Sequence, residues 1–307
     1  MSERINHSLI KVAVLLATYN GSDYIRSQIN TILGQEGVSI DLYIRDDGSF
    51  DSTCEEINCY MYDERVHILC DNVKTGSAAG NFFRLLDNIK NFNYSYVAFA
   101  DQDDVWFPEK IINAIRLIEH TNADAYSSNL ISFDNGLQES YFINKYSRWA
   151  KFDYLFQGAS AGCTYVLSSK ATVLLVNVLN NFLTSFPVGY SHDWLIYAIC
   201  RSHNLKWIHD NRAYIAYRQH GRNAFGAMPG FQGVLMRFKL ARSGWYREQI
   251  QWNRQFLLQT RDELRVLNAV KNFKLIDRLY LIINVLKFRR SKKDCFLIAM
   301  LFLLGLI

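Results

Sequence analysis

An α/β fold built on a mainly parallel sheet is the fold class that this 307-residue sequence predicts. Short apolar runs alternate with segments whose apolar residues recur at helical spacing, which is the pattern of repeated strand–helix units. Hydrophobic residues make up 50% of the chain and aromatic residues 14%, enough to form a sizeable core. Both observations place the chain well outside the disordered class.

The first half of the chain carries this alternation most clearly. Residues 11–17 predict a buried strand that ends in a Thr-Tyr-Asn-Gly turn, and the next apolar residues follow helical spacing at Ile25, Ile29, Ile32 and Leu33. Further strands are predicted at residues 41–45, 66–69 and 96–100. Helices are predicted after the capping residues 51–53, around residues 82–89 and at residues 109–119.

The alternation loosens after about residue 123. Residues 157–168 predict a glycine-rich loop that runs into a strand, and residues 205–217 hold two short strand-like runs. Residues 231–290 predict two or more helices that are basic overall. Pro229-Gly230 interrupts the pattern, so we expect one α/β domain over residues 1–228 and a helical C-terminal region over residues 229–307.

Charge and cysteine content restrict the expected binding partners and the cellular compartment. The net charge of +5 is mild, and the basic residues form no recognisable nucleic-acid-binding motif, so no nucleic-acid partner is expected. The six cysteines contain no Cys-x-x-Cys pair, which is typical of free thiols in a reducing compartment. The polar N-terminus resembles no signal peptide. The sequence therefore predicts a cytoplasmic protein.

The C-terminus combines a basic cluster at residues 287–293 with an apolar run at residues 295–307. As a helix this run would extend about 20 Å, less than the ~30 Å hydrocarbon core of a bilayer. A basic cluster beside an apolar helix favours peripheral docking on the anionic cytoplasmic face of a membrane. The alternative is an ordinary helix that packs on the domain or in a dimer interface.

Three carboxylates follow the predicted strand at residues 96–100, namely Asp101, Asp103 and Asp104. Ligands bind α/β sheets at the carboxyl ends of the strands, and three adjacent negative charges require a compensating cation. Carboxylate oxygens suit Mg²⁺ or Mn²⁺, which commonly bridge to a diphosphate. The alternative is a solvated acidic turn before a helix, since Pro108 and Glu109 form a good first helical turn.

A second acidic pair, Asp46-Asp47, ends the strand predicted at residues 41–45. Both acidic motifs should lie at the same edge of the sheet, which suits a nucleotide diphosphate: one carboxylate can accept hydrogen bonds from a pyrimidine N–H, and the other cluster can hold the metal. The glycine motifs of dinucleotide-binding folds and of phosphate-loop NTPases are missing from the sequence.

Two further motifs could perform chemistry. In Ser191-His192-Asp193-Trp194, Asp193 is placed to remove a proton from an incoming hydroxyl, although the same residues could simply cap a helix. The segment Tyr217–Asn223 carries two arginines and a histidine around a glycine, which suits phosphate oxygens. Its alternative is a basic surface turn.

With these residues in view, the chain resembles the family 2 glycosyltransferases of the GT-A fold, and most closely the bacterial rhamnosyltransferase-like enzymes of surface-polysaccharide assembly. The resemblance extends from Lys11 to about Asn223. Six motifs in the expected order carry it: Ala17–Gly21, Ile44–Ser49, Asp101–Trp106, Gly162–Thr164, His192–Trp194 and Tyr217–Gly221.

The resemblance implies a Rossmann-like GT-A domain and a role for each motif. Asp193 would be the catalytic base. Donor-binding residues would be Thr18, Asn20, Asp46, Asp47, Asp101, Arg218 and His220, with Asp46 or Asp47 on the base of the nucleotide and Arg218 and His220 near the leaving diphosphate. Asp101, Asp103 and Asp104 would hold Mn²⁺ or Mg²⁺, and the spacing leaves open whether Asp103 or Asp104 is the ligand.

The implied activity is inverting transfer of a sugar, with rhamnose from dTDP-rhamnose as the best match, to a hydroxyl of a growing, lipid-linked glycan. Two alternatives stay open at this point. A sugar nucleotidyltransferase also uses carboxylate-held metal on an α/β sheet, although the sequence lacks an obvious glycine- and lysine-rich N-terminal loop. A non-catalytic nucleotide-sugar-binding subunit would not need Asp193.

Overall fold

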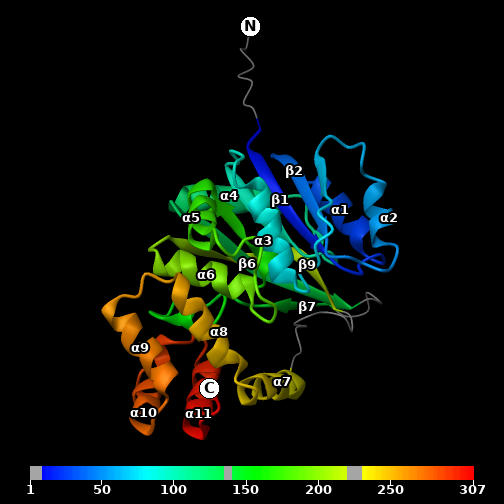
Figure 1. Ribbon diagram of the computed structural model, residues 1–307. Helices are drawn as coiled ribbons and strands as arrows, with labels where there is room; N and C mark the ends of the chain where they lie inside the picture. The colour runs from blue at the N-terminus through cyan, green and yellow to red at the C-terminus, as the bar shows by residue number, and fades with distance from the viewer. Residues whose placement is uncertain (1–8, 135–139, 220–229) are drawn as a thin grey trace.

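The computed structural model describes residues 9–134, 140–219 and 230–307, and its centre is one twisted sheet (Figure 1). The strand order along the sheet is β3-β2-β1-β4-β8-β6-β9-β5, and β7 pairs with β6 off this path. The strands are β1 (Lys11–Thr18), β2 (Ser39–Asp46), β3 (Val66–Leu69), β4 (Tyr96–Ala100), β5 (Val105–Trp106), β6 (Ala125–Asp134), β7 (Ser140–Ile143), β8 (Val166–Ser168) and β9 (Trp207–Gln219).

The predicted α/β class is confirmed. Strands β3, β2, β1 and β4 run parallel, and so do β6 and β9, so that most paired residues lie in parallel ladders. Strand β8 is antiparallel to both β4 and β6 and joins the two parallel parts. The two runs predicted within residues 205–217 form one strand, β9, whose register against β6 shifts between Ser128 and Asn129. This bulge explains why the sequence pattern breaks there.

Helices cover both faces of the sheet, as a parallel sheet requires. In β1, Val12, Val14 and Leu16 face one hydrophobic cluster and Ala13 and Leu15 face the other. The first cluster packs against α1 (Ile25–Leu33), α2 (Thr53–Asn58) and α4 (Lys110–Thr121). The second packs against α3 (Ala78–Ile89), α5 (Ser169–Leu179) and α6 (His192–Ser202).

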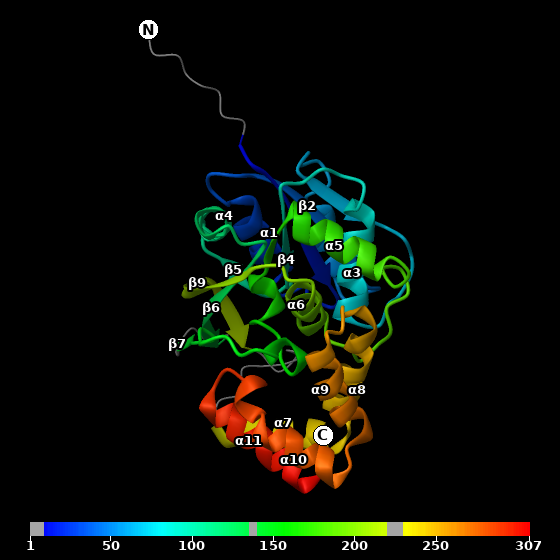
Figure 2. The same cartoon turned by 90° about the vertical axis from the view of Figure 1, so that its left-hand side faces the viewer.

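The C-terminal helices gather at the end of the molecule away from β1 and β2 (Figures 1 and 2). They are α7 (Gly230–Arg242), α8 (Trp245–Asn253), α9 (Arg261–Asn272), α10 (Leu275–Ile283) and α11 (Lys292–Leu304), with short 3₁₀ turns at Arg254–Phe256 and Val285–Lys287. Buried residues of α8, α9 and α11 belong to the same hydrophobic cluster as α3 and α6. The boundary predicted near residue 228 lies outside the described residues.

Most of the apolar run at residues 295–307 lies in α11, and only part of the run is buried. Cys295, Ile298, Leu301 and Phe302 of the helix and Ile307 after it are buried, whereas Phe296, Met300, Leu303 and Leu304 are exposed. The helix ends at Gly305, whose φ of +73° places it in the left-handed region that glycine tolerates. Among the described residues no helix has the length and apolar content needed to cross a membrane.

The parallel strands bring the two acidic motifs to one edge of the sheet, as predicted. Thr18 pairs with Asp46 at the ends of β1 and β2, and Leu16 pairs with Ala100 at the end of β4. Asp101 is the next residue after β4. The loops that follow these three strands therefore leave the sheet side by side, which is where open α/β sheets bind ligands.

Candidate active site

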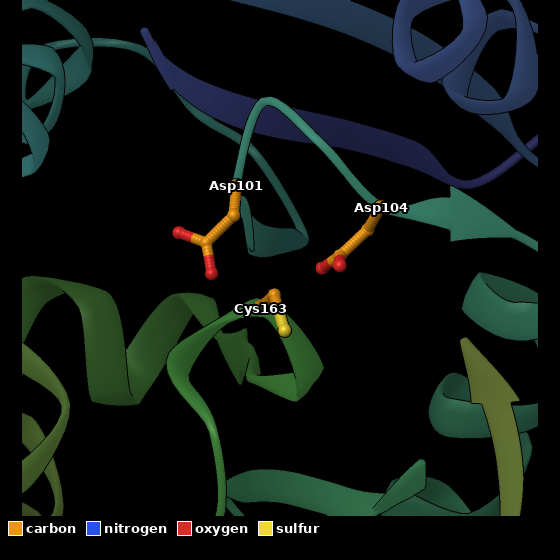
Figure 3. Close-up of side chains that lie close together, drawn as sticks. All are labelled: Asp101, Asp104 and Cys163. Carbon is orange, nitrogen blue, oxygen red and sulfur yellow. The ribbon is translucent and has the colours of Figure 1, made fainter. Parts of the chain in front are cut away.

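The loop after β4 directs two carboxylates at a common point (Figure 3). One oxygen of Asp101, one of Asp104 and the Sγ of Cys163 all lie within 4.8 Å of one another. Cys163 belongs to the 3₁₀ turn Gly162–Thr164, which packs under the end of β4. Asp104 is only 1% exposed, and neither of its oxygens has a hydrogen-bond partner of ordinary geometry among the described residues.

Burial and mutual repulsion make this cluster favour a cation. Burial, followed by the charges of Asp103 and Asp193, raises the pKa of Asp101 to about 7. Burial and the charges of Asp103 and Asp101 raise the pKa of Asp104 well above its ordinary value. Carboxylates with unsatisfied oxygens fit a hard divalent ion such as Mn²⁺ or Mg²⁺. The solvated acidic turn, the alternative for this motif, does not fit such burial.

Cys163 contributes to the cluster as a thiol. Burial and the charges of Asp104 and Asp101 raise its pKa well above the ordinary value, so the thiolate is strongly disfavoured. A thiol is a poor ligand for a hard ion, because soft thiolates suit other metals. The thiol lies beside both carboxylates and favours their charged forms.

Arg218, at the end of β9, reaches the same loop. Its Nε donates a hydrogen bond to the backbone oxygen of Asp103 at 3.1 Å, and its guanidinium lies 4.6 Å from the centroid of the Phe133 ring. Asp103 is 8% exposed. Arg218 therefore faces the acidic loop rather than forming a surface turn. His220, the other cation predicted here, lies outside the described residues.

The turn after β1 is tied to the acidic loop through Gln102. The hydroxyl of Thr18 and the backbone N–H of Tyr19 both donate to Gln102 Oε1 at 2.8 Å, and Gln102 Nε2 donates back to the Tyr19 oxygen at 3.0 Å. Asn20 has a φ of +50°, and its Oδ1 accepts a hydrogen bond from the N–H of Phe50. Thr18 and Asn20 thus hold three loops together at the predicted donor site.

Asp46 and Asp47 both shape neighbouring loops. Asp46 accepts hydrogen bonds from the backbone N–H groups of Gly48 and Ser49. Asp47 is buried, accepts the N–H groups of Thr75 and Gly76 at 2.7 and 2.8 Å, and pairs with Arg45 at 3.0 Å. These contacts hold residues 73–76 against the carboxyl edge of the sheet.

Asp193 lies in the first turn of α6, next to Gly162, the residue before Cys163. Ser191 caps this helix by accepting the N–H of Trp194, so the predicted capping role is confirmed for Ser191. Asp193 accepts hydrogen bonds from the Ser191 hydroxyl and from the Trp194 N–H, both on Oδ1. No hydrogen bond within the described part of the chain goes to Oδ2, which remains able to take a proton.

His192 is a weaker candidate base than its neighbour. Its ring lies 4.5 Å from that of Phe82, and its Nε2 is buried without a hydrogen-bond partner among the described residues. Burial lowers its pKa, although the charge of Asp193 partly offsets this effect. The imidazole is neutral and shielded, whereas Asp193 is close enough to raise the pKa of Asp101 through its charge.

Comparison with known proteins places this site in a family. Residues 13–176 match the family model described as Glycosyl transferase family 2. The chain is also 34% identical over 295 residues to the dTDP-rhamnosyl transferase RfbG of Shigella flexneri. The matched region covers 95% of this chain and all of RfbG. The chain belongs to glycosyltransferase family 2. The resemblance inferred from the sequence motifs is therefore confirmed.

A second relative has a named acceptor. It is the UDP-Glc:α-D-GlcNAc-diphosphoundecaprenol β-1,3-glucosyltransferase WfaP of Escherichia coli, 26% identical over 213 residues, which cover 68% of this chain and 77% of WfaP. The match to this enzyme and the match to RfbG concern glycosyltransferases rather than sugar nucleotidyltransferases.

Solved structures confirm the GT-A fold of this family 2 member. Staphylococcus aureus TarS 1–349 in complex with UDP-GlcNAc superposes with a TM-score of 0.59 at 16% identity, covering 97% of this chain and 82% of that one. Mannosyltransferase PcManGT from Pyrobaculum calidifontis, in complex with GDP-Man and Mn²⁺, superposes with a TM-score of 0.51 at 13% identity, covering 91% and 74%.

Lys110 is a site residue of this family 2 chain that the motifs did not indicate. Its side chain is 1% exposed, its Nζ lies 3.3 Å from the centroid of the Trp106 ring, and no described residue accepts a hydrogen bond from it. Burial lowers its pKa to about 7, while Cys163 and Asp104 favour its charged form. Its helical spacing from Ala114 and Ile118 could have revealed that it faces the core.

Arg45 provides a test of the buried framework. It is completely buried and donates to Asp47, Asp71 and Asn81. We expect Arg45→Met to lower the free energy of unfolding by about 3–5 kcal/mol, because Asp47 would keep a buried charge without its cation. Urea denaturation measures the loss. The control is Arg65→Met, which removes an exposed pair with Asp63 and should cost less than about 1 kcal/mol. Equal losses would contradict the prediction.

Proposed function

We propose that this protein is a metal-dependent, inverting rhamnosyltransferase that moves rhamnose from dTDP-rhamnose to a hydroxyl of a growing surface-polysaccharide glycan. The observation that carries the mechanism is the position of Asp193. It lies in the first turn of α6, a different element from the loop after β4, and is near the carboxylates of that loop. The identity to RfbG along nearly the whole chain supports the donor.

The reaction needs a base and a stabilised leaving group. Asp193 Oδ2 would take the proton of the acceptor hydroxyl. The acceptor oxygen would attack the anomeric carbon at the same time, and the bond from that carbon to the diphosphate would break. Asp101, Asp103 and Asp104 would hold Mn²⁺ or Mg²⁺, which would neutralise charge on the leaving diphosphate. A single displacement of this kind inverts the anomeric centre.

The remaining predicted residues form the proposed donor site. Thr18, Asn20, Asp46 and Asp47 would flank the nucleotide, with Asp46 or Asp47 close to its base. Their hydrogen bonds to neighbouring loops support a rigid site at this edge of the sheet. Asp101 would contact the ribose, and Arg218 and His220 would lie near the diphosphate.

A panel of sugar nucleotides with Mn²⁺ tests the proposal. Transfer from dTDP-rhamnose, or its slow hydrolysis to dTDP, supports a rhamnosyltransferase, and transfer from another donor alone would replace rhamnose with that sugar. Pyrophosphate exchange would favour a nucleotidyltransferase instead. Binding of a donor without any turnover would favour a non-catalytic subunit.

Peripheral membrane association is proposed for the helical region after residue 228. Helix α10 exposes Leu275, Ile276, Leu279 and Ile283, and the neighbouring α11 exposes a second apolar surface. Exposed lysines accompany these helices at positions 274, 287, 292 and 293. Apolar side chains rimmed by lysines suit an anionic lipid surface. Arg289 and Arg290, which the sequence analysis grouped with these lysines, are instead partly or largely buried.

Two substitutions on α10 test this surface. Ile276 and Ile283 are 75% and 81% exposed, so Ile276→Ser with Ile283→Ser should leave the fold intact. We expect the double variant to bind anionic vesicles at least about 10-fold more weakly, because each isoleucine buried in lipid contributes about 1.5–3 kcal/mol. Co-sedimentation measures binding, and Val173→Ser on α5 is the control. Unchanged binding of the double variant would assign α10 to another role.

A further inference from the structure

Four cationic side chains from three segments lie at or near one pocket, which Arg237 and Arg289 line. They are Lys145, which follows β7, Arg237 on α7, and Arg289 and Arg290 before α11; we call them the basic hollow. Lys145 is exposed to solvent, and partial desolvation and the nearby charges of Arg237 and Arg290 lower its pKa. Burial lowers the pKa of Arg289, and the charges of Arg237 and Arg290 act on it in the same direction. Arg237 and Arg289 also line one pocket, and Arg290 is the next residue in the chain, so the cations lie close together.

The basic hollow has more donors than acceptors. The side chain of Arg290 is 9% exposed. Its Nη2 donates to the backbone oxygens of Gly158 and Ala159. Its Nη1 is buried without a partner among the described residues. Arg289 donates through Nη1 to the Phe156 oxygen, and its Nε is likewise buried and unpaired within the described chain. A buried, unsatisfied N–H of a charged group costs about 1–3 kcal/mol or more, which an anionic ligand would recover.

The nearby carboxylates do not neutralise the basic hollow. Asp294 lies 3.8 Å from Arg237, which is a loose pair. Asp153 lies behind Arg290 at 3.5 Å and also pairs with Arg201. Four cations therefore face three carboxylates, because the charge of Asp193 also acts on Lys145, and Asp153 already pairs with Arg201. A ligand with several anionic oxygens, such as a diphosphate, matches this surplus because guanidinium groups bind phosphate oxygens in pairs.

An apolar pocket adjoins the basic hollow. Arg237 and Arg289 line it together with Asp294, and its other walls come from Phe156, Tyr246, Ile250, Leu297, Ile298, Leu301 and Ile307. Its cavity volume is small, about 20 Å³. Three of these residues belong to α11, the helix that also exposes Phe296 and Met300. An apolar path thus leads from the cations toward the exposed helices.

From Asp193 toward α11, the side chains change from charged to apolar. Arg290 donates to the Ala159 oxygen, the Ala159 N–H donates to the Tyr165 hydroxyl, and this hydroxyl donates to the backbone oxygen of Asp193, so the basic hollow begins beside the proposed base. In Figures 1 and 2, α7 and α11 lie among the C-terminal helices, and α11 extends to the far end of the molecule in Figure 1. We infer that the basic hollow binds the diphosphate of a lipid-linked acceptor, with its sugar directed toward Asp193 and its lipid chain along α11. This inference rests on the proposed function and names the acceptor class of that site.

A binding experiment tests the basic hollow without turnover. The ligand is farnesyl diphosphate, a soluble isoprenoid diphosphate, and EDTA removes the metal that the donor site would need to hold a diphosphate. We expect Lys145→Gln and Arg237→Gln each to weaken binding by about 10-fold, since each removes a charge-assisted contact. Arg242→Gln is the matched control, because this exposed arginine lies on the same helix outside the basic hollow. Circular dichroism confirms that each variant is folded.

Each outcome of this experiment decides the inference. Binding that is equal in wild type and in both variants would overturn it. If inorganic pyrophosphate binds as tightly as farnesyl diphosphate, the basic hollow is a site for free phosphate. If Arg237→Gln weakens vesicle binding but leaves farnesyl diphosphate binding unchanged, the basic hollow contacts membrane headgroups. Either result would overturn the assignment to a lipid diphosphate. Failure to transfer from any sugar nucleotide would contradict the proposed function alone, since binding in EDTA does not depend on it.

Discussion

Asp103→Ala and Asp104→Asn are each expected to abolish Mn²⁺- or Mg²⁺-dependent turnover, a loss of at least about 10³-fold. Each variant removes one negative charge from a cluster whose cation would compensate the donor diphosphate. Asp104→Asn is nearly isosteric, which matters because Asp104 is 1% exposed and has no room for a different shape. Steady-state kinetics with the metal concentration varied measure the loss.

The same cluster predicts how metal binding depends on pH. The pKa of Asp101 is raised to about 7, so below this pH the residue is mainly protonated and a proton competes with the metal. Affinity for Mn²⁺ should therefore fall by up to about 10-fold per pH unit below about pH 7, and it should level off above that pH. Titration of the protein with Mn²⁺ in the absence of donor measures this dependence.

A control separates ligation from general charge. Asp262→Asn removes a carboxylate that is 64% exposed, pairs with Lys151 and lies at the start of α9, so it should change neither turnover nor Mn²⁺ affinity. Full activity of the wild-type protein in EDTA would remove the metal from the mechanism. If Asp103→Ala is inactive but Asp104→Asn keeps its metal affinity, Asp103 is the ligand and Asp104 does not bind the metal directly.

Local sequence patterns were enough to predict the part of the fold that carries these carboxylates. Strand β1 is buried on both faces, so its residues form an unbroken apolar run that stands out in the sequence. The acidic residues begin directly after β4, and parallel pairing of β1 with β2 and β4 follows from the strand–helix alternation. The common edge of the sheet was predictable for that reason.

Residues whose roles depend on distant contacts were not predictable. Arg289 and Arg290 belong to a basic run that looks solvent-exposed, yet their guanidiniums bond backbone oxygens of Phe156 and Gly158, more than a hundred residues away. The apolar run ending at Ile307 likewise divides into a packed face and an exposed face only because other helices cover one side. Composition alone cannot distinguish these faces.

Asp193→Asn is expected to lower kcat by about 10²–10⁴-fold, the typical contribution of a general base. Asparagine keeps the shape of the side chain, and its Oδ1 can still accept the Ser191 hydroxyl and the Trp194 N–H, so the start of α6 should persist. What it loses is the ability to take a proton at the second oxygen. The donor Kd should change little, because the donor contacts proposed for Asp46, Asp47 and Asp101 remain.

Two measurements distinguish loss of the base from damage to the helix. Ser191→Ala removes the cap of α6 and should cost about 1 kcal/mol of stability while leaving most of kcat, whereas Asp193→Asn should do the reverse. The anomeric configuration of the product, read by NMR, should be inverted relative to the donor, because one carboxylate base opposite the leaving diphosphate permits a single in-line displacement. A retained configuration, or a normal kcat in Asp193→Asn, would take Asp193 out of this role and would require a nucleophile elsewhere in the site.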